Sequence, residues 1–134
     1  MLVKYKIAGG AYTLLFDESA GDANEKFAPS FRDALQKVQG YGAANAVKIP
    51  QSNTDGHVQF KWSSNYASAA AALAAIATLR ATFKGVTCHL QVTVGATVVY
   101  LPNATLASST HDPHGCECAH TLDFDCDDIT TTAP

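Results

Sequence analysis

Charged side chains are scarce in this sequence of 134 residues. Asp, Glu, Lys and Arg make up 16% of it, whereas about a quarter is typical of a globular domain. Only nine residues are Lys or Arg, and the formal net charge is −3. Because each contact with a phosphate needs a cation, this balance argues against tight binding of DNA. With 47% apolar residues the chain is globular, and we expect a partner to cover part of its apolar surface.

Long apolar runs and catalytic motifs are also missing. No run approaches the roughly 20 apolar residues that span a bilayer, so we expect no membrane partner. The sequence holds no nucleophile elbow, phosphate-binding loop or dinucleotide fingerprint, and we therefore expect no enzyme. At this length we expect a single domain with one core, residues 1–134, in which residues 127–134 form a flexible polar tail.

The first half of the chain contains several predicted strands. β-branched and aromatic residues predict strands over 3–8 and 11–16, on either side of Gly9-Gly10. The polar composition of 17–30 predicts a loop, and the pattern over 31–39 fits either a helix or a strand.

A hairpin is predicted next. Residues 45–50 and 57–62 have strand composition, and a polar segment that ends in Asp55-Gly56 separates them. Because Asp-Gly favours tight turns, we expect a turn over 51–56.

The clearest element is an alanine-rich helix over 65–84, which Gly85 is expected to end. At about 100° per residue, one face is predicted to pack on the core. That face comprises Ala69, Ala72, Ile76, Leu79 and Phe83, with Leu73 at its edge. The opposite face is small and uncharged: Ala71, Ala74, Ala75, Thr78, Ala81 and Thr82. Such a face allows close approach of a second backbone, so its members Ala71, Ala74, Thr78 and Ala81 are candidate subunit contacts.

The second half of the chain alternates between apolar and polar residues. We expect strands over 87–94, 97–101 and 116–126, with a further strand over 104–110 after a break at Pro102-Asn103, and a loop over 111–115. The residues predicted to point inward are Cys88, Leu90, Val92, Val94, Cys116, Cys118, His120, Leu122, Phe124 and Cys126. Those predicted to point outward from the last strand are Glu117, Ala119, Thr121, Asp123 and Asp125. This order favours an α+β fold, mainly an antiparallel β-sandwich or partly closed barrel, with one packed helix.

The cysteines leave one alternative function open. Cys88, Cys116, Cys118 and Cys126, with His111, His114 and His120 nearby, could build a small zinc or iron–sulfur module. However, two cysteines that alternate along a strand lie about 7 Å apart, which is too far for both to hold one ion without a bend. We therefore expect buried thiols and no metal or cofactor.

The acidic residues near the C-terminus have a simpler explanation. Asp123, Asp125, Asp127 and Asp128 lack the glycine and the distal glutamate of a calcium loop. We expect them to form a solvated acidic face.

The segment NAVKIPQSNTDGHVQFKWSSNYASAAAALAAIATLRATFKGVTCHLQVTVGATVVYLPNATLAS resembles small tail proteins of long-tailed bacteriophages, of the tail-tube and distal-tail (baseplate ring) type. The resemblance lies in the order of elements over residues 34–126. An Asn-x-Val-x-Ile-Pro strand is followed by a polar turn, an aromatic-ended strand, an alanine-rich helix near Tyr66 and a hairpin that leads into LPNATL. It favours a strand near 35–39.

The resemblance implies a virion structural protein that is assembled in the cytoplasm of a bacterial host. Copies would join through sheet edges into a ring, usually hexameric, beside neighbouring tail or baseplate proteins. Genome DNA would pass through the channel without specific binding, and Asp123 and Asp125 are candidates to face it. An acidic lining would suit this passage because DNA carries about one charge per 1.7 Å.

Overall fold

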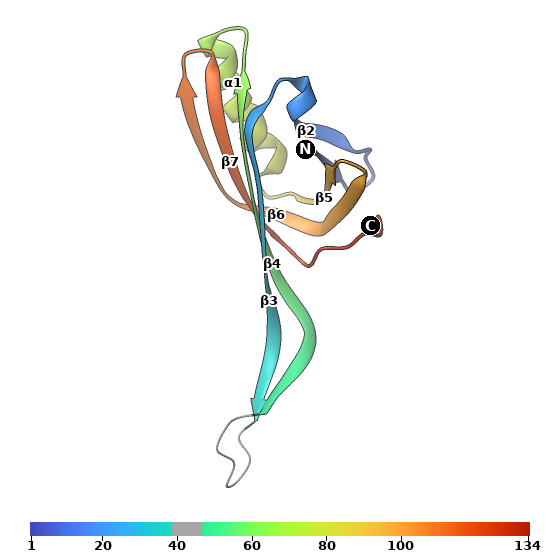
Figure 1. The fold of residues 1–134 in the computed structure, drawn as a ribbon. Helices are drawn as coiled ribbons and strands as arrows, with labels where there is room; N and C mark the ends of the chain where they lie inside the picture. Colours follow the sequence, from blue (N-terminus) through green and yellow to red (C-terminus); the bar gives the residue numbers. More distant parts are fainter. Residues whose placement is uncertain (39–46) are drawn as a thin grey trace.

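The computed structural model describes the backbone of residues 1–38 and 47–134. Within these residues there are seven strands and one α-helix, which packs beside the strands at one end (Figure 1). The elements are β1 (Leu2–Ile7), β2 (Thr13–Asp17), a short 3-10 helix (Glu18–Ala20), β3 (Ala23–Val38), β4 (Val47–Asn65), α1 (Ala69–Phe83), β5 (Thr87–Val94), β6 (Thr97–His114) and β7 (Glu117–Cys126). Within the described ranges, no helix is long and apolar enough to cross a membrane.

The strands form one antiparallel sheet in the order β2-β1-β5-β6-β7-β4-β3. β6 changes partner along its length, because it pairs with β5 up to Thr105 and with β7 from Thr105 onward. The sheet therefore divides into a short-strand layer (β2, β1, β5 and residues 97–105 of β6) and a long-strand layer (residues 105–114 of β6, β7, β4 and β3). β2 and β3 end the sheet without pairing with each other, so it is not a closed barrel. The predicted mainly antiparallel fold with one helix is confirmed.

Aromatic side chains join the two layers and the helix. Phe16 of β2 stacks on Trp62 of β4 with ring centres 4.6 Å apart. At the C-terminal end of α1, Phe83 contacts Phe124 of β7 at 5.3 Å and Tyr5 of β1 at 4.8 Å. Burying a large apolar side chain contributes about 1.5–3 kcal/mol, so this cluster fixes how the layers and α1 pack.

The helix is confirmed, with a later start than predicted. β4 continues through Asn65, which pairs with Glu117, and the Ser68 hydroxyl then accepts a hydrogen bond from Ala71 N at 3.1 Å. Such a cap satisfies one of the free N–H groups that begin a helix. Gly85 follows the helix at φ 69°.

The core face of the helix is narrower than predicted. Ala72 and Phe83 are buried, and Ile76 and Leu79 are half-buried, as expected. Ala69 is exposed and Leu73 is 57% exposed, because α1 packs mainly on β6 and β7 and these two side chains lie outside that contact.

The predicted turn over 51–56 is wrong. β4 runs unbroken through it, and Asp55 and Gly56 pair with Arg32 and Phe31 of β3. Gly56 is needed for close packing instead, because a Cβ there would lie 2.9 Å from both the carbonyl oxygen and the sulfur of Cys126. Residues 39–46, which connect β3 and β4 along the chain, lie outside the described residues.

The predicted loop over 17–30 is also wrong beyond its first residues, since β3 begins at Ala23. β3 is an edge strand and therefore tolerates Pro29, which cannot donate to a neighbouring strand. The doubtful stretch 31–39 is a strand through Val38, as the resemblance favoured, and Gln39 lies outside the described residues. Together β3 and β4 form a long arm that extends away from the layers (Figure 1).

β6 differs from the two strands and loop that were predicted. Pro102 and Asn103 bend it without ending it, with Asn103 at φ 54°, and the strand continues to His114. A two-residue turn, Gly115-Cys116, then leads into β7, so Cys116 is exposed in the turn and does not point inward.

The remaining strands follow the predicted alternation closely. β1, β2, β5 and β7 lie where expected, except that Val94 at the end of β5 is exposed. After β7, Thr130 pairs with Tyr100 of β6 through backbone hydrogen bonds of 2.7 and 2.9 Å. The single-domain organisation and the mobility of the tail stay predictions.

Candidate functional site

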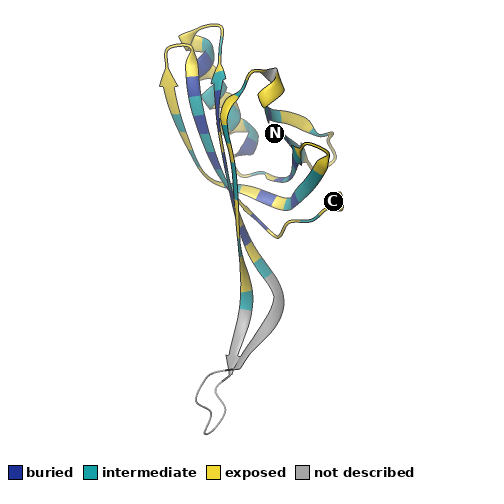
Figure 2. Cartoon of the chain, viewed as in Figure 1, coloured by how far each residue is buried: buried dark blue, intermediate teal, exposed yellow. Residues whose placement is uncertain are grey.

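The outer face of the long-strand layer carries the two predicted acidic residues. Buried and less buried residues alternate along β7 (Figure 2). Cys118, Leu122 and Phe124 face the core, and Asp123 and Asp125 lie on the other side. Asp125 is directly opposite His57 of β4, and Asp123 is opposite Ser108 of β6. Three strands therefore bring these polar side chains together.

His57 lies between the two carboxylates. Its Nδ1 is 3.2 Å from Asp125 Oδ1, and its Nε2 is 3.5 Å from Asp123 Oδ1. The Ser108 hydroxyl donates to the other oxygen of Asp123 at 3.0 Å. The side chains of Asp125 and His57 are 65% and 49% exposed, so these contacts contribute little to stability. The side chains of Asp125 and His57 are therefore accessible to a partner or to solvent.

Sequence analysis identified Asp123 and Asp125 but missed His57. Its outward direction follows from the alternation of β4, in which Val58, Phe60 and Trp62 are buried and His57, Gln59 and Lys61 are not. The position of His57 beside β7 could not be predicted, because the sequence analysis placed a turn at 51–56. The structure has a continuous β4 there, and its register with β7 brings His57 opposite Asp125.

The outer face of this layer carries no large exposed apolar side chain among the described residues. The large exposed apolar residues are elsewhere, in the short-strand layer, in α1 and after β7: Ile7, Leu14, Leu73, Val94 and Ile129. The outer face is therefore suited to contact with water, whereas the other surfaces still expose apolar groups.

Most of the predicted contact face of α1 is exposed in the subunit. Ala74, Thr78 and Ala81 are exposed, whereas Ala71 is half-buried. The Thr78 hydroxyl donates to Ala74 O at 3.0 Å, and that of Thr82 donates to Thr78 O at 2.8 Å. Because the helix itself satisfies these hydroxyls, the face is effectively apolar. The exposed Leu73 and Ala77 adjoin it.

The cysteines do not form a cluster. Cys88 and Cys126 belong to the main core cluster, Cys118 is buried near the other end of β7, and Cys116 is exposed. Burial raises the pKa of the Cys88 and Cys126 thiols to about 11, and it also raises that of Cys118. Thiols of this kind are protonated at neutral pH and are poor metal ligands. Across the described part of the chain, no group of three or more His, Cys, Asp or Glu side chains is arranged to hold a metal ion.

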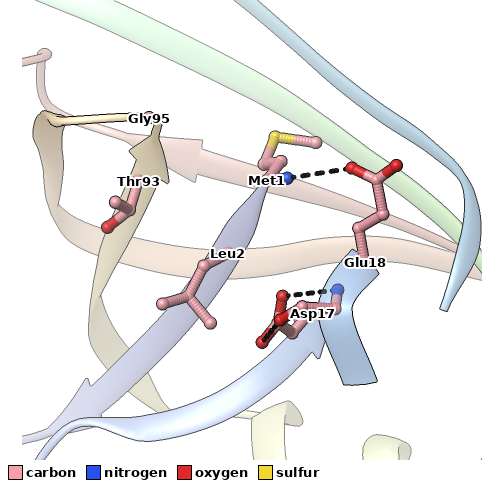
Figure 3. Close-up of a pocket in the computed structure, with 7 residues that line it drawn as sticks. Met1, Leu2, Asp17, Glu18, Thr93 and Gly95 are labelled. Carbon is pink, nitrogen blue, oxygen red and sulfur yellow. Dashed lines mark hydrogen bonds and ion pairs between the residues drawn. The ribbon is translucent and has the colours of Figure 1, made fainter. Parts of the chain in front are cut away.

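A surface hollow of about 490 Å³ lies at one end of the short-strand layer, lined by Met1, Leu2, Asp17, Glu18, Ser19, Thr93 and Gly95 (Figure 3). Its polar groups already have local partners. Asp17 accepts hydrogen bonds from the backbone N–H and the hydroxyl of Ser19 at 3.0 and 2.8 Å, and the Met1 ammonium is 3.5 Å from Glu18 Oε2. We therefore assign no ligand to this hollow.

Comparison with solved structures identifies relatives of the fold. A chain in the tail of an empty gene transfer agent particle, solved by helical refinement with C6 symmetry, superposes with a TM-score of 0.57. It is 14% identical, and the match covers 99% of this chain and 96% of that chain. The chain has the fold of a tail protein. A chain in the virion of a native gene transfer agent particle matches with a TM-score of 0.54 at 13% identity, over 98% of this chain and 95% of that chain.

The tail-protein resemblance that the order of elements predicted is thus confirmed at the level of the fold. No protein-family model matches the chain, and no curated protein sequence matches it significantly. At 13% and 14% identity a shared tail-protein fold says nothing about single residues. The roles of Asp123, Asp125 and the α1 face therefore rest on the geometry of this chain.

Proposed function

We propose that this chain is a structural protein of a virion tail. Copies of it would join into a ring around the channel through which DNA passes. The observation that carries the proposal is the fold shared over nearly the whole length with a chain of a C6-symmetric tail. C6 symmetry in that tail supports six copies per ring here. The role we propose is a structural one, which the tail and virion chains that share the fold support.

The outer face of the long-strand layer is the surface we assign to the channel. It combines the exposed Asp125 and the partly exposed Asp123 with small polar side chains, and it lacks large exposed apolar groups among the described residues. Carboxylates that face DNA repel its phosphates, so the genome slides without sticking. α1 packs on the opposite face of this layer and would lie away from the channel.

Two open strand edges support ring closure. β3 pairs only with β4, and residues 108–114 of β6 pair only with β7 in the described chain. An open edge presents unpaired N–H and C=O groups and is a template for pairing with another chain. Because these edges bound the same layer, pairing β3 of one copy with β6 of the next extends that layer around the ring.

The α1 surface supplies a second contact. Ala71, Ala74, Thr78 and Ala81 are our candidate subunit contacts, and the neighbouring Leu73 adds a large apolar side chain that would be covered on assembly. Neighbouring tail or baseplate proteins are alternative partners for this surface.

Size-exclusion chromatography with light scattering, followed by electron microscopy of the eluted species, tests the proposal. We expect closed rings with a mass of about six chains, or stacks of such rings, and their fraction should rise with protein concentration because assembly follows mass action. A monomer at every concentration tested would contradict a self-assembling ring.

A further inference from the structure

Three polar side chains form a hydrogen-bonded row beneath α1. Tyr66 follows β4, and its hydroxyl oxygen lies 2.8 Å from Nε2 of His120 on β7. The other ring nitrogen of His120, Nδ1, lies 2.7 Å from Nδ1 of His111 on β6. His111 and His120 are directly opposite each other in the β6–β7 pairing, and His120 is fully buried, with 0% of it exposed.

The short distance between the two imidazoles restricts their protonation. A hydrogen bond between two nitrogens needs one N–H and one lone pair, so at least one of the two Nδ1 atoms must be unprotonated. If both rings were cations, two N–H groups would point at each other. His111 Nε2 is also buried without a hydrogen-bond partner, so a proton added there would have no acceptor.

The surrounding groups also oppose protonation. Arg80 of α1, which donates to Ser109 Oγ at 3.2 Å, places a positive charge near His111. Burial first, and Arg80 second, lower the pKa of His111. Burial first, and His111 second, lower the pKa of His120 to about 4, and Asp22 before β3 acts in the opposite direction. On the His120 side, Cys118 Sγ lies 3.8 Å from Nδ1, and Asp112 is near that thiol.

α1 depends on this part of the sheet. It contacts β6 and β7, its last residue Phe83 packs on Phe124 of β7, and Arg80 bonds to β6. Phe124 and His120 share the buried face of β7, so the histidine pair lies on the surface that carries the helix. A change in the distance between β6 and β7 at this point would disturb the surface on which α1 packs.

We propose that Tyr66, His120 and His111 form an acid-sensitive switch that holds α1 on the β6–β7 hairpin while both imidazoles are neutral and releases it when the pair takes up protons. The switch is a property of the single subunit and does not depend on the ring. In an assembled ring it would make the α1 contact surface sensitive to acid, because α1 carries that surface.

The direction of the pH dependence follows from the lowered pKa values. An unfolded histidine has a pKa near 6.5, so in mild acid the unfolded chain binds protons that the folded chain excludes. The stability that the neutral pair supports is fully present above about pH 6.5 and is lost as the pH falls toward 4. For each histidine whose pKa is lowered on folding, the folding equilibrium constant falls by up to about tenfold for each unit by which the pH drops within that window.

Urea unfolding of the full chain at steps from pH 7 to pH 4.5 tests the switch. We expect the folding constant to fall steeply below pH 6.5, and we expect His120→Phe, which removes the buried titrating group, to reduce the slope by about one proton. His114→Gln is the matched control, because His114 lies in the same hairpin with its side chain 81% exposed, and it should leave the slope unchanged. A wild-type folding constant that does not change between pH 7 and pH 4.5 would overturn the proposal.

Two further measurements keep the test decisive if His120→Phe does not fold. In the wild-type chain, an NMR titration should find the His120 ring neutral at pH 5.5, and a charged ring at that pH would contradict the switch. Amide hydrogen exchange, corrected for its intrinsic pH dependence, should show α1 losing protection between pH 7 and pH 5 before β4 does. Equal loss of protection in α1 and β4 would contradict the switch. Metal analysis that finds one zinc per wild-type chain, and none in Cys118→Ala, would also contradict it.

Discussion

The two faces of the long-strand layer differ sharply in chemistry although they share the same strands. The face toward α1 and the short-strand layer carries Val58, Phe60, Trp62, Leu122 and Phe124, each at most 2% exposed. The outer face carries His57, Gln59, Lys61, Asp123 and Asp125, none of them buried. Strand alternation thus separates the residues that hold the fold from those that are free to meet a partner. Substitutions on the inner face should cost stability, and those on the outer face should alter assembly or function.

Removal of an aromatic side chain from the inner face should have the largest effect. Phe60 lies 6.0, 5.4 and 6.1 Å from the rings of Phe16, Phe27 and Phe124, so Phe60→Ala leaves a cavity between the layers. We expect the free energy of unfolding to fall by about 3–5 kcal/mol in urea denaturation. Gln59→Ala, one residue away on the outer face, should stay within about 0.5 kcal/mol of wild type. Similar losses from both variants would mean that the faces are not distinct.

A methyl group at Gly56 tests how closely β4 and β7 pack at one end of the layer. The added Cβ would lie 2.9 Å from Cys126 O and Sγ and 3.0 Å from Phe31 Cδ1, so Gly56→Ala must push strands apart. We expect a loss of about 1–3 kcal/mol, as for other overpacked sites. Asp55→Ala at the preceding, exposed position is the control. If Gly56→Ala is as stable as wild type, the glycine is there for another reason.

The element boundaries show where sequence patterns sufficed and where they did not. β5 and β7 were predicted correctly because each alternates strictly with one face buried. β4 was divided in two because Asp55-Gly56 signals a turn locally, whereas the space beside Cys126, which requires the glycine, exists only once β7 lies next to it. Pro102-Asn103 likewise suggested a strand end, yet the chain bends there to pass from one layer to the other.

The candidate site was predictable only where it depends on the alternation within one strand. Alternation within β7 alone placed Asp123 and Asp125 on the outer face. His57 and the pairing of His111 with His120 depend on contacts between strands, which no pattern within a single strand reveals. The core face of α1 was predicted too wide, with Ala69 and Leu73 included, because helical periodicity does not show which strands the helix covers.

A charge on the helix surface should separate folding from assembly. Ala74 is exposed in the subunit, so Ala74→Glu should change the free energy of unfolding by only a few tenths of a kcal/mol. In a tight subunit contact the same carboxylate would be buried, and light scattering should then find a folded monomer in place of the ring. Ala69→Glu, also exposed but about 140° around the helix, is the control that should still assemble. Rings formed equally well by both variants would remove α1 from the subunit contact.

The smallest effect on folding is expected for the outer carboxylates. Converting both Asp123 and Asp125 to Lys should leave the subunit folded and the ring intact, since their contacts with His57 are exposed. If they face the channel, the new cations attract phosphates, and DNA ejection from assembled particles should slow, more so at low salt. Lys84→Glu, at the exposed end of α1, is a charge-changing control outside that face. Unchanged ejection would mean that Asp123 and Asp125 face elsewhere.

Electron cryo-microscopy of the assembled rings would show which face of the long-strand layer lines the channel. We expect a sixfold ring in which β3 of one copy pairs with β6 of the next. His57, Asp123 and Asp125 should face the channel, and α1 should lie on the side away from it. A ring in which α1 or the short-strand layer lines the channel, with Asp125 on the outside, would contradict the proposed assembly.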